Sequence, residues 1–173
     1  GMEVRIVPGE EADGSEVGEL QLRPASSPTF FSRYLDGERF EGEWWQTGDL
    51  VSEDEEGYLF FEGRGDDIIL SSGYRIGPTE VEAALLSHPA VADAAAVAAP
   101  DPERGAVVRA IVVLRDGDGA SGDERLIREL QEHCKRETAP YKFPRIVEFA
   151  DELPKTSSGK IKRAQLRGAP GPL

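Results

Sequence analysis

The chain has 173 residues, 39% of them hydrophobic, and a formal net charge of −13 at pH 7. This length suits one ordinary domain or two small ones, and the hydrophobic fraction is typical of a soluble globular protein. So acidic a chain argues against a general binder of nucleic acid or of a membrane surface, because both of those partners are negatively charged. Anionic ligands would need a local cluster of basic side chains.

The first third of the chain shows patterns typical of β-structure. Alternating apolar and polar residues predict strands over 3–7 and 19–23. Two further strands, over 44–51 and 58–61, flank the acidic turn 52–57, and this arrangement predicts a hairpin. Short strands joined by Gly-rich turns indicate a small barrel or part of one.

The pattern changes after the first third. A helix is expected from Pro78 to about Pro89, and a second helix from a capping box of Ser121 and Glu124 to about Thr138. Strands are predicted over residues 67–70, 74–76, 91–99, 107–114 and 145–149, and a short helix is predicted at the end of the chain. Alternating helices and strands are typical of a compact α/β unit.

Residues that bind metals or form disulfides are scarce. Cys134 is the only cysteine, which leaves no internal disulfide and no zinc framework. His88 and His133 are too few and too far apart to indicate a metal site, so no protein-bound metal is expected. No apolar run approaches the ~20 residues of a membrane-spanning helix, and no signal-peptide pattern opens the chain. A cytoplasmic location is therefore expected.

Three motifs contain chemically informative residues. Residues 45–50 are Trp-Gln-Thr-Gly-Asp-Leu, residues 63–67 are Gly-Arg-Gly-Asp-Asp, and residues 153–163 contain Ser-Ser-Gly-Lys. In the last motif Lys160 follows Gly159, which gives a loop backbone freedom. A protonated lysine on a flexible side chain suits the stabilisation of an anion that develops in a transition state.

In their order and spacing these motifs resemble those of the AMP-forming acyl-CoA synthetases of the adenylate-forming superfamily. Residues 63–82 look like the core motif of that family nearly throughout. Residues 101–105 and 139–145 are similar to the medium-chain branch in particular. The resemblance covers roughly residues 3–167 and corresponds to the last third of a full-length enzyme.

The resemblance implies an α+β fold in two parts. Residues 1–62 would be a β-rich, barrel-like remnant of a large N-terminal domain. Residues 63–173 would be a compact, mobile α/β lid, with a hinge near Asp66. The phosphate-binding loop and the acyl pocket of such enzymes belong to the N-terminal domain, so the chain alone is expected to be inactive and to depend on that domain.

The resemblance also implies an acid–thiol ligase that acts in two half-reactions. A carboxylic acid, expected to be a fatty acid, reacts with ATP, which brings Mg²⁺, to give acyl-AMP and pyrophosphate. CoA then forms the thioester. ATP, CoA and the acid are the expected small-molecule partners, and neither nucleic acid nor a membrane span is expected.

Five residues match positions that handle the nucleotide and the hinge in this family. Asp49 would accept hydrogen bonds from the ribose hydroxyls. Arg64 would also reach the nucleotide and Arg75 would contact phosphate, since a guanidinium suits phosphate oxygens. Lys160 would bridge the attacking carboxylate and the α-phosphate, and Asp66 would be the hinge.

Five further residues match positions that contact CoA. Ser72, Gly73 and Tyr74 would line the pantetheine tunnel in the thioester-forming state. Arg104 and Arg145 would hold the CoA nucleotide.

Two other functions remain open at this point. The chain could be a stand-alone regulatory or docking module, because the phosphate-binding loop is not in it. It could also derive from an adenylation domain that charges a carrier protein in place of CoA.

Overall fold

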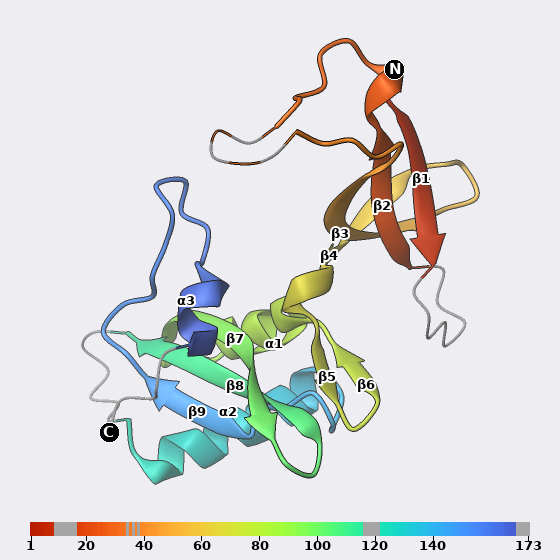
Figure 1. Ribbon diagram of the computed structural model, residues 1–173. Helices are drawn as coiled ribbons and strands as arrows, with labels where there is room; N and C mark the ends of the chain where they lie inside the picture. Colours follow the sequence, from red (N-terminus) through yellow and green to blue (C-terminus); the bar gives the residue numbers. More distant parts are fainter. Residues whose placement is uncertain (9–16, 34, 36, 38, 116–121, 169–173) are drawn as a thin grey trace. The chain divides into compact units, whose positions relative to one another are not determined.

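The computed structural model describes residues 1–8, 17–33, 35, 37, 39–115 and 122–168 (Figure 1). The chain divides into two compact units, Gly1–Asp66 and Asp67–Leu173. The division falls between two neighbouring aspartates, the first of which is the predicted hinge. Both units contain strands and the second also contains α-helices, so the predicted α+β class is confirmed.

The first unit is built around one antiparallel sheet in the order β1-β2-β3-β4. Its strands are β1 (Glu3–Pro8), β2 (Gly18–Arg23), β3 (Trp45–Glu53) and β4 (Leu59–Arg64), with a short 3-10 turn at Pro24–Ser26. A barrel closes only when its first and last strands pair. Among the described residues β1 pairs only with β2, and β4 only with β3. The sheet is therefore open in the described part of the chain, which excludes a closed barrel and agrees with the alternative expectation of part of one.

The hairpin predicted around the acidic turn is present. Strands β3 and β4 pair antiparallel, and the backbone N–H of Glu56 and of Tyr58 each donate to Asp54 Oδ1, at 3.0 and 2.9 Å. The carboxylate of Asp54 thus satisfies backbone donors that the turn leaves without strand partners. The acidic residues here stabilise and solvate a turn.

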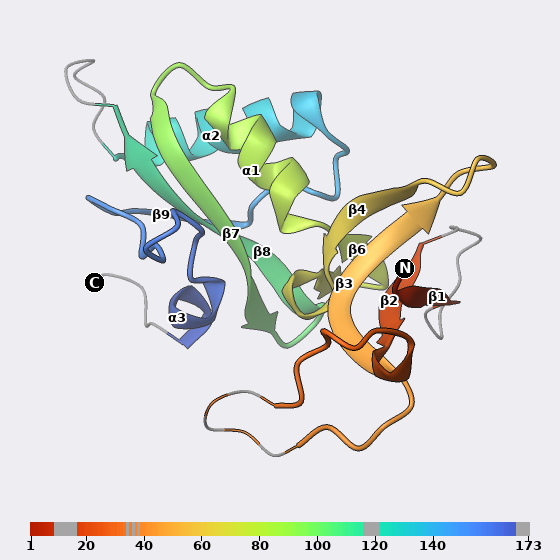
Figure 2. The same ribbon diagram turned by 90° about the horizontal axis from the view of Figure 1, so that it is seen from above.

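The second unit is a five-stranded sheet with helices on both faces (Figure 2). The 3-10 turn Gly65–Asp67 leads into it. Its elements are β5 (Ile69–Ser71), β6 (Tyr74–Ile76), α1 (Pro78–Leu86), β7 (Val91–Asp101), β8 (Gly105–Leu114), α2 (Glu124–Glu137), β9 (Ile146–Phe149) and α3 (Arg163–Gly168). The strand order is β6-β5-β8-β7, and β9 pairs with β8 in parallel.

Alternation along β7 produces the two faces of this sheet. Ala94 and Ala96 belong to the apolar core beneath α1 and α2. Ala95 and Val97 point to the other face, where Leu166 of α3 packs. Because side chains of a strand alternate in direction, one run of small apolar residues serves both layers. The small size of the alanines lets helices approach the sheet on either side.

The helix starts differ in detail from their prediction. Pro78 opens α1 as expected. Helix α2 begins after Asp123, whose Oδ1 accepts from the backbone N–H of Leu126 at 2.9 Å. Asp123 is therefore the N-cap, and it satisfies one free N–H of the first turn. The predicted capping residue, Ser121, lies outside the described residues. No helix in the described part of the chain has the length and apolar character needed to cross a membrane.

The buried thiol of Cys134 gives a test of the core. Its side chain is 0% exposed, and burial raises the pKa of this thiol to about 11. We expect labelling by a thiol reagent at pH 8 to be slow in the native protein and fast in denaturant, because the thiolate reacts. Between about pH 9 and 11 the unfolded thiol ionises and the folded one does not, so the free energy of unfolding falls as pH rises by roughly 2–3 kcal/mol. Fast labelling of the native protein would contradict this packing.

The turn between β5 and β6 gives a second test. Ser72 and Gly73 have φ of +49° and +83°, the two positive values of a type I′ hairpin turn. A Cβ at Gly73 would meet no atom within 4 Å, so only the backbone conformation requires glycine for folding. We expect Gly73→Ala to lower the free energy of unfolding by about 1 kcal/mol. Gly73→Asn should cost less, because asparagine enters this conformation more readily. Urea denaturation of the two variants measures the difference, and equal costs would contradict it.

Candidate functional site

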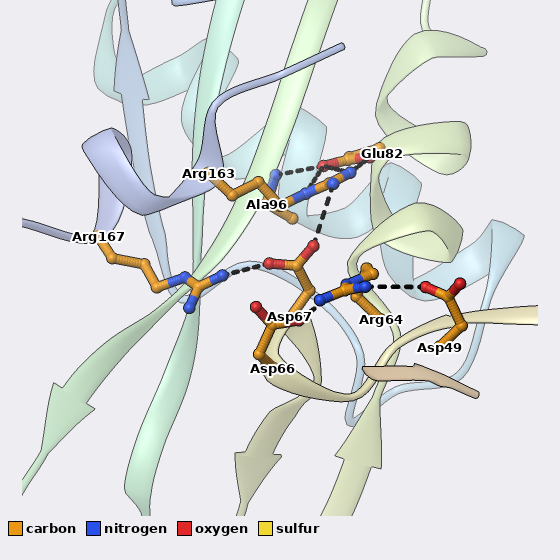
Figure 3. A network of polar contacts seen from close by, with 8 residues as sticks. All are labelled: Asp49, Arg64, Asp66, Asp67, Glu82, Ala96, Arg163 and Arg167. Carbon is orange, nitrogen blue, oxygen red and sulfur yellow. Dashed lines mark hydrogen bonds and ion pairs between the residues drawn. The ribbon is translucent and has the colours of Figure 1, made fainter. Parts of the chain in front are cut away.

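Asp49, Arg64 and Asp66 form one polar cluster in the first unit (Figure 3). Register places Asp49 of β3 opposite Arg64 of β4. Arg64 Nη1 donates to Asp49 Oδ1 at 3.0 Å and to the backbone oxygen of Thr47 at 2.7 Å. Arg64 Nε donates to Asp66 Oδ1 at 3.1 Å. The structure thus brings the predicted ribose-binding and hinge residues together around one guanidinium.

The backbone at Gly48 makes room for this guanidinium. Gly48 has φ of +74°, and a Cβ there would lie 2.7 Å from Arg64 Nη2. The hydrogen bond with Asp49 is the main cause that raises the pKa of Arg64 above its ordinary value. Because the pair is largely exposed, it contributes only about 0–1 kcal/mol to stability. The contact restrains the Asp49 side chain through its Oδ1.

Lys160 lies in a tight loop before α3. The backbone N–H of Thr156 donates to Lys160 O at 2.8 Å, and that of Lys160 donates to Thr156 Oγ1 at 3.0 Å. Lys155 and Ile161 form an antiparallel bridge across the loop. The Lys160 side chain is exposed, and none of the described residues forms a hydrogen bond or ion pair with its Nζ. An ordered loop thus presents an uncommitted ammonium group.

The neighbouring Lys155 differs from Lys160. Its Nζ lies 2.5 Å from Asp93 Oδ2, near the beginning of β7. This ion pair holds the base of the loop against the sheet. The sequence places Lys155, Lys160 and Lys162 in this stretch. Only the structure distinguishes Lys155, which pairs with a carboxylate, from the two lysines that have no side-chain partner among the described residues.

Two of the predicted CoA-binding residues come into direct contact at the β5–β6 turn. Arg104 Nη1 donates to Ser72 Oγ at 3.1 Å, and the backbone N–H of Ser72 donates to Arg104 O at 3.0 Å. The backbone N–H of Arg104 donates in turn to Asp101 Oδ1, at the end of β7. Residues far apart in sequence therefore form a single corner beside Gly73.

The other predicted CoA and phosphate residues lie on exposed surface of the same unit. Tyr74 stacks on Tyr141, with ring centroids 4.3 Å apart, and both rings are partly exposed. Arg75 follows Tyr74 on β6 and is exposed. The guanidinium of Arg145 lies 5.0 Å from the ring centre of Phe143. None of these contacts brings Arg75 or Arg145 to the corner formed by Ser72 and Arg104.

The Lys160 loop and the Ser72–Arg104 corner lie at opposite ends of β7 (Figure 1). Asp93 contacts the loop, and Asp101 contacts the corner. At about 3.4 Å per residue, the stretch of strand between these two aspartates spans roughly 27 Å. The contacts that hold the loop and the corner are therefore well separated along this strand.

A second polar network was not predicted from the sequence (Figure 3). Arg163, the first residue of α3, donates to both carboxylate oxygens of Glu82 on α1 and to Asp67. Arg167 also pairs with Asp67. Asp67 and Glu82 belong to the motif 63–82, which was the only available sequence signal, and nothing in that motif identifies Arg163 as their partner.

The described residues include no group of three or more His, Cys, Asp or Glu side chains arranged to hold a metal ion. The chemistry available in the described part of the chain is that of fixed carboxylates, guanidinium groups and the two unpaired lysines Lys160 and Lys162. Such groups bind and orient polyanions and hydroxyl groups.

Comparison with known proteins agrees with a set of side chains suited to binding a nucleotide. Residues 80–160 match the family described as the AMP-binding enzyme C-terminal domain. Acyl-coenzyme A synthetase ACSM3, mitochondrial, of Mus musculus is 50% identical over 94% of this chain, and so is acyl-coenzyme A synthetase ACSM5, mitochondrial, of Homo sapiens. The chain spans 28% of the length of each of these relatives.

Solved structures of CoA ligases are also similar to this chain. The anthranilate CoA ligase AuaEII in complex with anthranoyl-AMP is 37% identical, with a TM-score of 0.74 over 96% of this chain and 33% of that one. The o-succinylbenzoate CoA synthetase MenE of Bacillus subtilis, in complex with the acyl-adenylate OSB-AMP, is also 37% identical, with a TM-score of 0.74 over 99% of this chain and 35% of that one. The chain therefore corresponds to the C-terminal part of the AMP-forming acyl-CoA synthetases.

Proposed function

We propose that this chain acts as the C-terminal part of an ATP-dependent ligase that joins a carboxylic acid to CoA. In the first step a carboxylate oxygen attacks the α-phosphate of ATP, and pyrophosphate leaves. In the second step the sulfur of CoA attacks the acyl carbon, its proton is lost, and AMP leaves. The observation that carries the proposal is the uncommitted Lys160 in an ordered loop of a chain 50% identical to acyl-coenzyme A synthetases.

Asp49 binds the ribose of the nucleotide in this proposal. A carboxylate can accept hydrogen bonds from both hydroxyls of a diol. The contact with Arg64 engages Oδ1 and restrains the side chain, which supports a preorganised acceptor. Arg64 is itself committed to protein oxygens, so its part is to position Asp49 as well as to contact the nucleotide through its remaining N–H groups.

Lys160 stabilises the first transition state. Negative charge there is shared between the incoming carboxylate and the α-phosphate, and an ammonium group placed between them lowers the barrier. The loop orders the backbone on both sides of Lys160 and leaves the side chain free to reach the reacting atoms.

The corner of Ser72, Gly73, Arg104 and the adjoining Tyr74 serves the second step. The pantetheine arm of CoA passes beside Gly73, where no side chain intrudes, and Arg75 and Arg145 contact phosphate groups. The open space above Gly73 supports this assignment.

Several finer points complete the proposal. Magnesium enters with ATP, bound to phosphate oxygens. The resemblance of residues 101–105 and 139–145 favours a fatty acid of medium chain length. The free, buried Cys134 fits a reducing compartment such as the cytoplasm, whereas the printed names of the curated relatives assign those proteins to mitochondria. A docking module or a carrier-charging domain is not favoured, since those relatives are acyl-coenzyme A synthetases.

The central test is Lys160→Ala in the longest natural protein that contains this chain. Acyl-AMP formation, followed by ATP–pyrophosphate exchange, should fall by on the order of 10²–10³. Thioester formation from supplied acyl-AMP and CoA should keep its rate, because Lys160 serves only the first step. The control is Arg128→Ala, which removes one exposed positive charge from α2. Unimpaired exchange in Lys160→Ala would refute the proposal.

A second test uses the 173-residue chain by itself. The proposal assigns the phosphate-binding loop and the acyl pocket to a preceding domain, so this chain alone should show no ATP–pyrophosphate exchange with any carboxylic acid from short to long. Exchange that disappears in Lys160→Ala would mean that the chain holds a complete adenylation site, and the assignment of the phosphate-binding loop and the acyl pocket to a preceding domain would be wrong.

A further inference from the structure

The two aspartates at the boundary between the units are held by different arginines. Asp66 is bound by Arg64 of the first unit, Nε to Oδ1 at 3.1 Å. Asp67 is bound by Arg163 of the second unit, Nη1 to Oδ2 at 3.3 Å, and also by Arg167. Each carboxylate is therefore tied to its own unit, and the backbone between the two residues is the segment left to rotate.

On the Asp67 side, Arg163 connects four elements. Its Nε donates to Glu82 Oε1 at 3.2 Å and its Nη2 donates to Glu82 Oε2 at 2.7 Å, a two-point contact that a guanidinium and a carboxylate form in one plane. Glu82 Oε1 also accepts from the backbone N–H of Ala96 at 2.9 Å. The network therefore joins the turn at Asp67, helix α1, strand β7 and the first residue of α3 (Figure 3).

These groups are largely withdrawn from solvent. The side chains of Glu82, Asp67 and Arg163 are 9%, 12% and 21% exposed. Burial alone would lower the pKa of Arg163, but the hydrogen bond and charge of Glu82 and the charge of Asp67 outweigh it and raise that pKa. An ion pair with so little water around it holds a more definite geometry than a surface pair.

The network lies next to the Lys160 loop in sequence and in space. Arg163 follows Lys160 by three residues, and the backbone N–H of Lys162 donates to Pro154 O at 2.8 Å, closing the loop just before α3. The other end of α3 is held separately, because Arg109 Nη1 donates to Leu166 O at 3.1 Å. Arg167, near that end, also pairs with Asp67, but Arg163 is the arginine next to the Lys160 loop and the one that binds both Asp67 and Glu82.

We propose that Arg163 is a positioning residue for Lys160, which it holds in fixed relation to the hinge by binding Asp67 and Glu82 at once. The proposal rests on the proposed function. Rotation about the bonds between Asp66 and Asp67 then moves the Lys160 loop as part of one rigid body. The Ser72–Arg104 corner, at the far end of β7, does not depend on this network.

The first test measures hydrogen exchange in the 173-residue chain and needs no activity. In Arg163→Met, the amides of Thr156 and Gly159, which donate within the loop, should exchange on the order of tenfold faster. Amides of β8 should keep their protection. The control is Arg128→Met, which breaks an exposed ion pair with Glu124 on α2.

The second test separates the half-reactions in the longest natural protein that contains this chain. Arg163→Met should slow acyl-AMP formation by on the order of 10²-fold, chiefly in kcat, because a misplaced catalytic group loses most of its effect. Thioester formation from supplied acyl-AMP should keep its rate. The rate of acyl-AMP formation in Arg163→Lys should lie between that of the unmodified protein and that of Arg163→Met, since a lysine keeps the charge and loses the two-point contact.

If Arg163→Met fails to fold, isosteric variants of the two carboxylates that bind Arg163 provide the same test. Asp67→Asn and Glu82→Gln keep the shape of each side chain and remove its charge, and each should slow acyl-AMP formation in the same selective way. The positioning role would be overturned by equal losses of rate in both half-reactions. It would also be overturned if hydrogen exchange of the loop amides stayed unchanged. Absence of adenylation in the wild-type protein would instead contradict the proposed function, and hydrogen exchange would still decide whether Arg163 orders the loop.

Discussion

In the second unit, a two-point ion pair between Arg163 and Glu82, to which Asp67 is added, joins three backbone segments. Charges taken out of water are costly, and a guanidinium offsets that cost only when every facing carboxylate is matched by an N–H group. This requirement fixes three backbone segments at once, because the partners come from the 3-10 turn, from α1 and from the start of α3. A pair of this kind adds little net stability compared with an apolar contact, but it permits few alternative arrangements.

The long strand β7 supplies the second constraint. Its alternating small residues let helices pack on both faces, and the middle of the strand, from Ala94 to Val97, is buried. Such packing makes the distance between its ends meaningful: a group at Asp93 and a group at Asp101 keep their separation whatever the unit does as a whole. The strand therefore acts as a spacer between the Lys160 loop and the Ser72–Arg104 corner.

Much of this could be predicted from the sequence, for reasons that differ by element. Strands β7 and β8 follow from local apolar patterns, and α1 follows from Pro78 and its first turn, because these signals lie within a few residues. The open shape of the first sheet could not be predicted, since closure depends on which outer strands meet. Arg163 meets Asp67 and Glu82 across 96 and 81 residues of sequence, and no local pattern reports such a pairing. The candidate site residues came from motif resemblance, whereas their grouping into a cluster, a loop and a corner came from the fold.

The two polar groupings at the boundary explain why a hinge between adjacent aspartates is a physically reasonable arrangement. A rotation is reproducible only if the segments on either side of the pivot are stiff, and here Arg64 stiffens one side while Arg163 stiffens the other. Under the proposed function, one active site must receive Lys160 in the first step and the Ser72–Arg104 corner in the second. Because β7 separates the contacts that hold these two groups, the proposal would have the second unit turn between the two steps, and a turn confined to one pair of residues would return each group to the same place in every cycle.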